Sequence, residues 1–246
     1  MSQTEVRSAE ALAGVPSGGL ERRSAVRWPV IAAGGWPRVR AAARDAGYEI
    51  AKRIFDVVTA SALLCVAAPV MVAAAVLIRV TSRGPVFFLQ RRAGRYGRPF
   101  SMYKLRSMVR AAEDDKDLFR RFNALPTGPC FKMKDDPRVT RIGRYLRRAS
   151  LDELPQLFNV LMGDMSIVGP RPLPLDEVRD DTADHALRMS VKPGLTCLWQ
   201  VSGRTEIPYE EWLALDVWYV RNRTFILDLQ ILIKTLPAVL TGHGAY

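Results

Sequence analysis

Two adjacent carboxylates, Asp152 and Glu153, stand directly before an apolar run, and a loop carrying Arg171 follows that run. Carboxylates beside arginine and lysine suit a site for phosphate and a divalent metal, because magnesium takes one or two protein carboxylates together with phosphate oxygens. Pro170 and Pro172 restrict the backbone on both sides of Arg171, and a guanidinium presented in this way matches a phosphate group. These residue types and spacings therefore predict chemistry on phosphates.

Ser150 and Glu153 also have the spacing of a capping box, in which both side chains bind backbone N–H groups at a helix start. We therefore expect Asp152 in the first turn of the next helix, where the helix dipole favours its ionised form and an anionic nucleophile can approach a phosphate. Capping explains Glu153 without chemistry, but it does not explain Asp152. Apolar residues at helical spacing give this helix a buried face: Leu154, Leu157, Phe158 and Leu161.

The elements around the acid pair are strongly basic. A β-hairpin is expected across the turn at residues 94–97, and Arg91, Arg92, Lys104 and Arg106 lie on it. In residues 138–148, apolar side chains share one helical face and arginines at 138, 141, 144 and 148 share the other. A short strand bounded by turns is expected between residues 163 and 173.

Two later segments have open interpretations. Trp199 lies in a loop-rich stretch between cations, where it either stacks on a base or sugar or packs in the core. Residues 225–240 form an apolar helical segment, broken at Pro237, that either packs as core or lies in a membrane interface.

Composition narrows the class of protein. The chain has 246 residues and a net charge of +11, which implies an anionic partner such as nucleic acid, lipid headgroups or phosphorylated substrates. A hydrophobic fraction of 48% argues against a polytopic membrane protein. The three cysteines are widely spaced and form no CxxC pair, which favours a reducing cytosolic location. The two histidines lie far apart, which argues against a histidine-rich zinc site.

Residues 57–78 carry no charge, and as a straight helix they would extend roughly 33 Å, close to the ~30 Å thickness of the bilayer hydrocarbon. Pro69 lies near the middle and is expected to break the helix. Both flanks are basic, with Lys52 and Arg53 before the segment and arginines after it. The pattern leaves open a re-entrant hairpin, a spanning helix and a buried core helix. Residues 1–48 read as a disordered or variable tail.

Four motifs occur in order: KRIFDVV from Lys52, QRRAGRYGRPFSMYKLRSM from Gln90, SLDELPQLFNVLMGDMSIVGPRP from Ser150 and KPGLTCLWQVSGR from Lys192. Through them the chain resembles the bacterial sugar transferases, the small monotopic phosphoglycosyl transferases of the exopolysaccharide-priming type. The resemblance covers about residues 50–235. It implies transfer of a sugar-1-phosphate from a UDP-sugar, with glucose or galactose as the family default, to undecaprenyl phosphate. The resemblance further implies that UMP is released and that the reaction is the first membrane step of exopolysaccharide or related glycoconjugate synthesis.

The resemblance also implies roles for individual residues. Asp152 would attack the sugar-bearing phosphorus and form a phosphosugar-aspartyl intermediate, with Glu153 holding or positioning Mg²⁺; both acids are candidate metal ligands. The segment around Pro69 would be a re-entrant membrane helix, flanked by Lys52 and Arg53 at the headgroups. The candidates for phosphate contacts are Lys104, Arg106, Arg147 and Arg171.

The expected fold is thus a mixed α/β, mainly helical monotopic membrane protein. It would consist of a re-entrant helix at 49–83 and a cytosolic catalytic domain at 84–246 that contains a β-hairpin and interfacial helices. We expect it at the bacterial inner (cytoplasmic) membrane, with membrane lipid and no nucleic acid as partner. The competing interpretations are a non-enzymatic membrane-tethered binder of nucleic acid or acidic polymer, and a single-span scaffold with a degenerate site. Few aromatic residues accompany the basic stretches, which weighs against nucleic acid.

Overall fold

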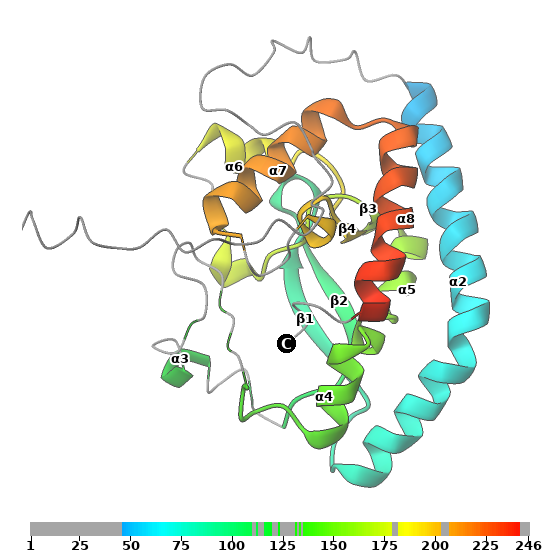
Figure 1. The fold of residues 1–246 in the computed structure, drawn as a ribbon, viewed down its shortest axis with the longest axis vertical. Coiled ribbons are helices and arrows are strands. Elements are labelled where there is room, and N and C mark those ends of the chain that lie inside the picture. The colour runs from blue at the N-terminus through cyan, green and yellow to red at the C-terminus, as the bar shows by residue number, and fades with distance from the viewer. Residues whose placement is uncertain are drawn as a thin grey trace, which may run out of the picture. The chain divides into compact units, whose positions relative to one another are not determined.

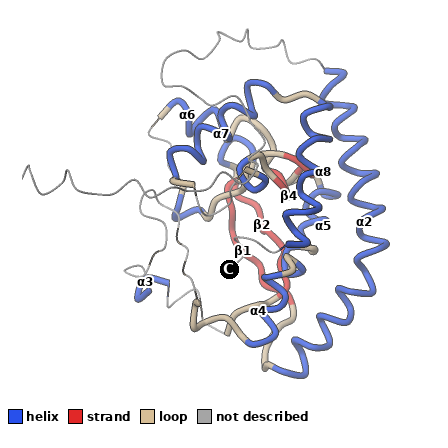
Figure 2. Tube along the Cα trace, viewed as in Figure 1, coloured by secondary structure: helices blue, strands red, loops and turns tan. Residues whose placement is uncertain are grey.

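The computed structural model describes residues 46–109, 112, 116–119, 123, 131, 133, 135–178, 182–202 and 207–241. These residues all belong to the second of two units into which the chain divides, Met1–Gly35 and Trp36–Tyr246. Helices predominate in the described residues, and the strands form two small two-stranded sheets (Figures 1 and 2). This confirms the expected mixed α/β, mainly helical class. The predicted tail at 1–48 lies outside the described residues, apart from residues 46–48.

The apolar segment lies in the longest helix, α2, which spans Ala46–Thr81 (Figure 1). Within the described residues α2 alone is long and apolar enough to cross a membrane. Between residues 61 and 70 its side chains are mostly exposed, and Val66 is 75% accessible. Because a contiguous exposed apolar surface is costly in water, this part of α2 is compatible with a monotopic membrane protein.

Pro69 lies inside α2, and the helix continues on both sides of it. Proline removes one backbone donor and crowds the carbonyl four residues earlier, which is why the sequence predicts a break. The structure has no such interruption: the two halves of the segment form one helix and not a hairpin of two. The re-entrant path depends on a bilayer and stays a prediction.

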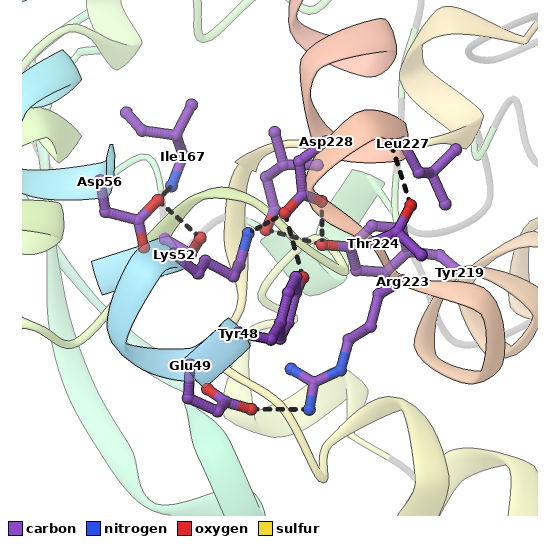
Figure 3. Close-up of polar contacts among 12 residues, drawn as sticks. Tyr48, Glu49, Lys52, Asp56, Ile167, Tyr219, Arg223, Thr224, Leu227 and Asp228 are labelled. Atoms are coloured by element: carbon purple, nitrogen blue, oxygen red, sulfur yellow. Dashed lines mark hydrogen bonds and ion pairs between the residues drawn. The ribbon is translucent and has the colours of Figure 1, made fainter. Parts of the chain in front are cut away.

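The first turns of α2 pack into the folded unit through polar side chains (Figure 3). The Lys52 ammonium pairs with Asp228 of α8 (Phe225–Thr241) at 2.7 Å, and the Tyr48 hydroxyl donates to the same carboxylate at 3.1 Å. The Tyr219 hydroxyl donates to Asp228 as well, at 2.7 Å. Asp228 has no exposed surface, so its charge needs these three donors.

Two more residues of the same helix, Arg53 and Asp56, bind neighbouring elements. Arg53 donates to the carbonyl oxygens of Val160 and Leu161, at 2.6 and 2.7 Å, at the end of α5 (Gln156–Met162). Asp56 accepts hydrogen bonds at 2.9 Å from Ser166 and Ile167 of β3 (Ser166–Val168). These contacts correct the headgroup prediction for Lys52 and Arg53: a buried carboxylate and two helix-terminal carbonyls attract the cations inward.

The predicted hairpin is confirmed as β1, Phe87–Ala93, and β2, Pro99–Leu105, which pair antiparallel around a turn at Arg95–Gly97. Along β1 the side chains alternate, because successive residues of a strand face opposite sides. Phe87 and Leu89 are exposed, whereas Phe88, Gln90 and Arg92 are less exposed. Phe88, Gln90 and Arg92 border a cavity that Phe87 also lines.

The helix after the acid pair, α5, spans Gln156–Met162 and is fastened to β2 by Asn159. The fully buried Asn159 amide accepts from Tyr103 N at 3.0 Å and donates to Ser101 O at 2.8 Å. Of the predicted buried face, Leu157 is buried but Phe158 is 43% exposed. The prediction for Phe158 is wrong because α5 is covered by α2 and β2 on other sides.

The predicted short strand is β3, Ser166–Val168, and it pairs in parallel with β4, Gly194–Thr196. Gly169, directly after β3, and Gly194, the first residue of β4, approach closely: a Cβ atom added to Gly194 would lie 2.1 Å from the Gly169 nitrogen. Glycine at both positions therefore allows the segment that carries Arg171 to lie directly beside β4.

The remaining described helices surround these elements (Figure 1). α8 passes through Pro237 without ending, so the predicted break is absent there too; Leu227 and Ile231 are buried, while Ile226 and Leu236 are exposed. The core interpretation therefore holds for one side of α8, and a membrane interface stays a prediction for its exposed side. The bounds are α3 Lys116–Phe119, α4 Arg141–Arg148, α6 Ala183–Arg188, α7 Tyr209–Asn222 and α8 Phe225–Thr241, with 3₁₀ turns at Leu151–Glu153, Leu175–Glu177 and Trp199–Val201.

Candidate active site

Asp152 and Glu153 lie in the 3₁₀ turn Leu151–Glu153, ahead of α5. Ser150, which precedes the turn, has a left-handed backbone with φ of 55° and makes no capping hydrogen bond through its side chain. The capping-box prediction is therefore wrong, because the left-handed residue redirects the chain and the Glu153 carboxylate has other partners. Glu153 therefore does not cap the helix, and its carboxylate is available for other contacts.

The two carboxylates face different surroundings. Asp152 is 6% exposed and borders a cavity of about 510 Å³. Glu153 is not among the described residues that line this cavity. Its carboxylate instead binds the Arg171 guanidinium, at 2.6 Å from Oε1 to Nη2 and 3.5 Å from Oε2 to Nη1. Lys104 Nζ lies 3.4 Å from the same Oε1.

The predicted phosphate-binding residues Lys104, Arg147 and Arg171 also line the cavity. They come from three separate elements: Lys104 from β2, Arg147 from α4 and Arg171 from the segment after β3. Arg147 donates from Nε to Ser107 Oγ at 2.9 Å. α4 can approach Ser107 closely because it has glycine at 143, where an added Cβ atom would lie 1.9 Å from the Ser107 carbonyl oxygen. The fold therefore brings together three of the four predicted cations.

Arg106, the fourth candidate, also has a structural role. Its guanidinium donates to the carbonyl oxygens of Arg83 and Ser82, at 3.1 and 2.9 Å, and to the Ser82 hydroxyl. Arg106 is buried, and these contacts tie the end of β2 to the segment that follows α2. Arg106 also borders the cavity, so its phosphate contact stays a prediction beside this structural link.

The surroundings of the two acids shift their pKa values in opposite directions, upward for Asp152 and downward for Glu153. Burial raises the pKa of Asp152, as does the charge of Glu153, while Lys104, Arg147 and Arg171 oppose that rise. For Glu153 burial acts in the same direction, but Arg171 and Lys104 outweigh it and hold its pKa well below the usual range. Burial also lowers the pKa of Lys104 to about 8, against the opposing effect of Glu153. Glu153 is therefore a permanent anion bound to cations, whereas Asp152 remains open to the cavity.

The rest of the cavity wall contains residues that sequence reasoning did not assign to the site. Arg138 was predicted on a helical arginine stripe, but it precedes α4 and is buried, paired with Asp136 at 2.7 Å. Trp199 packs edge-to-face on Trp212 with ring centroids 4.2 Å apart, which makes it part of an aromatic wall. Glu177 accepts a hydrogen bond from Phe131 N at 3.3 Å. Glu177 lies 46 residues from the Phe131 nitrogen that it binds, so no local pattern places Glu177 in the cavity wall.

The comparison with known families agrees with this site. A model described as "Bacterial sugar transferase" matches residues 47–242, which include the acid pair and all the cations around it. The chain belongs to the bacterial sugar transferase family. The expected family assignment is thereby confirmed.

Curated relatives share the same region. The chain is 44% identical over 205 residues to the "Undecaprenyl-phosphate galactose phosphotransferase" of Salmonella typhimurium, covering 79% of this chain and 41% of that protein. It is 44% identical over 195 residues to the "Uncharacterized sugar transferase EpsL" of Bacillus subtilis, covering 79% and 90%. It is 40% identical over 206 residues to the "UDP-glucose:undecaprenyl-phosphate glucose-1-phosphate transferase" of Caulobacter vibrioides, covering 80% and 73%. The chain thus spans less than half of the Salmonella protein but most of the other two.

Proposed function

We propose that this sugar transferase moves a sugar-1-phosphate from a UDP-sugar to undecaprenyl phosphate and releases UMP. The observation that carries the proposal is the position of Asp152, a carboxylate at the wall of a large cavity with Lys104, Arg147 and Arg171 beside it. The names of two relatives support the substrate class, since one mentions galactose and the other UDP-glucose, both with undecaprenyl phosphate. Galactose or glucose is therefore the sugar to test first.

The chemistry divides into two displacements. In the first, an ionised oxygen of Asp152 attacks the phosphorus that bears the sugar, its bond to the UMP oxygen breaks, and UMP leaves with the electron pair. In the second, an oxygen of the lipid phosphate attacks the phosphosugar-aspartyl intermediate and the Asp152 carboxylate is released. Lys104, Arg147 and Arg171 would stabilise the negative charge on the transferred group.

The acid pair fits a magnesium ion only with help from the substrate. Within the described residues, no three or more His, Cys, Asp or Glu side chains gather to hold a metal. Asp152, and Glu153 to the extent that Arg171 leaves an oxygen available, would supply one or two ligands, and phosphate oxygens and water would supply the rest, as is usual for Mg²⁺. A bound ion would neutralise charge on the diphosphate and the leaving UMP.

The proposed acceptor, undecaprenyl phosphate, is a membrane lipid, so the enzyme should lie at the membrane. We propose that α2 anchors the chain in the bacterial inner membrane by a re-entrant path, with the site on the cytosolic face. The exposed apolar surface of α2 at residues 61–70 supports membrane contact, and the family assignment supports a lipid acceptor. The exposed apolar sides of α8, which include Ile226 and Leu236, are candidates for interfacial contact.

The deciding experiment is a donor screen with the detergent-solubilised full chain, undecaprenyl phosphate and Mg²⁺, scored by UMP release. We expect UDP-glucose or UDP-galactose to support turnover. We also expect one UMP per enzyme to be released from the donor when the lipid is omitted, because the first displacement does not need it. Failure of every UDP-sugar to release UMP would contradict the proposal.

Substitution of the nucleophile tests the role of Asp152. Asp152→Asn should reduce UMP release by at least about 1,000-fold, because an amide cannot attack phosphorus in this way, while membrane association is unchanged. The matched control is Asp184→Asn, since Asp184 is a surface acid of α6 with 53% of its side chain exposed. Near wild-type turnover of Asp152→Asn would show that the nucleophile is a different group.

A further inference from the structure

The backbone that carries Arg171 is held at every carbonyl from residue 170 to residue 173. Two of the donors are backbone nitrogens of strands, and two are arginine side chains that are not ligands of the acid pair. The four hydrogen bonds are Gly194 N to Pro170 O at 2.9 Å, Arg188 Nη2 to Arg171 O at 2.8 Å, Arg92 Nη1 to Pro172 O at 2.8 Å, and Ala93 N to Leu173 O at 2.9 Å.

The two prolines explain why side chains are needed here. Pro170 and Pro172 have no backbone N–H, so this segment cannot pair as a regular strand. A carbonyl buried without a donor would cost free energy. The arginine donors satisfy two of these carbonyls, that of Arg171 itself and that of the residue after it.

Arg188 is itself fixed by a second ion pair. It ends α6, and its Nη2 and Nε atoms lie 2.7 and 3.1 Å from Oδ2 of Asp216 on α7. Only 8% of the Arg188 side chain and 3% of the Asp216 side chain are exposed. The same Nη2 therefore joins α7, α6 and the Arg171 carbonyl in one buried chain of contacts.

Stability does not account for such a pair. A buried ion pair often stabilises a protein no better than apolar residues of the same volume, because desolvating two charges offsets their attraction. Asp216 Oδ1 is also buried without a hydrogen-bond partner, which is a further cost. The distinctive feature of the Arg188–Asp216 pair is its contact with the segment that carries Arg171.

We propose that Arg188, oriented by Asp216, is a positioning residue: it fixes the Arg171 backbone so that the Arg171 guanidinium meets Glu153 beside Asp152. Arg188 acts through Arg171 and is not among the described residues that line the cavity. The two-point contact of Arg171 with Glu153, at 2.6 and 3.5 Å, is sensitive to the position of that backbone. This inference rests on the transfer reaction proposed above.

The test removes the pair without leaving a buried charge. The double variant Arg188→Met/Asp216→Leu is made both in the unsubstituted chain and in an Arg171→Lys chain, and first-turnover UMP release and melting temperature are measured for each. The control is Arg221→Met, because Arg221 makes an ion pair with Asp184 that also joins α7 to α6, at 3.7 Å, but on the surface.

With Arg171 present, the double variant should slow the first turnover by about tenfold or more. The melting temperature should fall only by the cost of the Arg171 carbonyl left without a donor, and equally in both chains. In the Arg171→Lys chain the further loss should be under about threefold, because a lysine is a flexible point charge that needs no fixed backbone. Arg221→Met should be near neutral in both chains.

An equal loss of rate in both chains, or no loss in the unsubstituted chain, would overturn the positioning role. If the double variant does not fold, Arg188→Lys replaces it, since lysine can keep either the contact to Asp216 or that to Arg171. It should then lose activity only in the chain that retains Arg171. An unsubstituted chain that releases no UMP would instead refute the proposed function, so the two failures are distinguishable.

Discussion

At the scale of single residues, the acid pair shows that neighbours in the sequence can have opposite environments. Asp152 borders the cavity, and burial raises its pKa. Glu153 is held as an anion by Arg171 and Lys104, which keep its pKa low despite burial. Environments that separate the pKa values of paired carboxylates are typical of sites where the two groups have different roles. Glu153 thus stays ionised among its cations, while Asp152, the nucleophile of the proposed reaction, borders the cavity.

The pKa of Lys104 predicts an alkaline limit to activity. Lys104 carries its charge below about pH 8 and loses it as the pH rises through that value, because burial lowers its pKa to about 8. The rate should therefore fall above about pH 8. Lys104→Arg should move this limb to higher pH, since a guanidinium stays charged.

The measurement is the pH dependence of first-turnover UMP release for both chains. Lys192 provides a control, because it is a second partly buried lysine that is not among the described residues lining the cavity. Lys192→Arg should leave the alkaline limb in place. A limb that is the same in the parent and in Lys104→Arg would contradict the assignment to Lys104.

At the scale of elements, the start of α2 is a structural part of the folded unit. Lys52 and Asp56 connect it to α8 and β3, and Arg53 connects it to α5. β3 continues into the segment that carries Arg171, so the hydrogen bonds of Asp56 to β3 also help to fix the position of that segment. The start of α2 and the candidate site are therefore linked through β3 and also through α5.

We predict that the buried Lys52–Asp228 ion pair contributes to the free energy of unfolding. Lys52→Met leaves Asp228 buried with only hydroxyl donors, and the free energy of unfolding should fall by about 3–5 kcal/mol. Lys52→Met/Asp228→Leu should recover most of that loss, because no unpaired charge remains. Denaturant unfolding in detergent measures both.

Glu49→Gln is the matched control for this pair. Glu49 is on the same helix and pairs with Arg223 at 2.7 Å, but 36% of its side chain is exposed, so its loss should cost less than about 1 kcal/mol. Equal costs for Lys52→Met and Glu49→Gln would contradict the importance of the buried pair.

At the scale of the whole molecule, α2 is packed on one side near both of its ends and exposed in between. Lys52, Asp56 and Ala60 are buried in its first turns and Ala74 and Ile78 in its last turns, whereas residues 61–70 are mostly exposed. A boundary between a membrane helix at 49–83 and a catalytic domain at 84–246 therefore divides a packed unit. The family match, which begins at residue 47, includes these first turns.

Truncation tests this division. A chain that starts at residue 46 should keep the thermal transition of the full chain, while a chain that starts at residue 84 should lose it, because Lys52, Asp56 and Ala60 are removed from buried positions. Circular dichroism melting in detergent measures the transition. A chain from residue 84 that melts like the full chain would show that the start of α2 is dispensable for folding.

Local sequence was sufficient to predict several secondary-structure elements and the acid pair of the candidate site. The apolar run of α2, the β1–β2 hairpin, the strand after Gly163 and the acid pair all follow from residues that are neighbours in the chain, since period and turn chemistry act over a few residues. The same local rules failed at Ser150, where a left-handed backbone replaces a cap, and at Pro69, where the helix continues.

Tertiary structure alone decided which charges meet. Lys52 pairs with a carboxylate 176 residues away, and Lys104 reaches Glu153 across 49 residues. Lys104 and Arg106 are close neighbours in the chain, yet Arg106 binds the segment after α2 and Lys104 binds the acid pair. Whether a residue is lysine or arginine does not specify its partner, because any carboxylate or carbonyl that lacks a donor attracts either side chain. The topology determines which of these lies within reach.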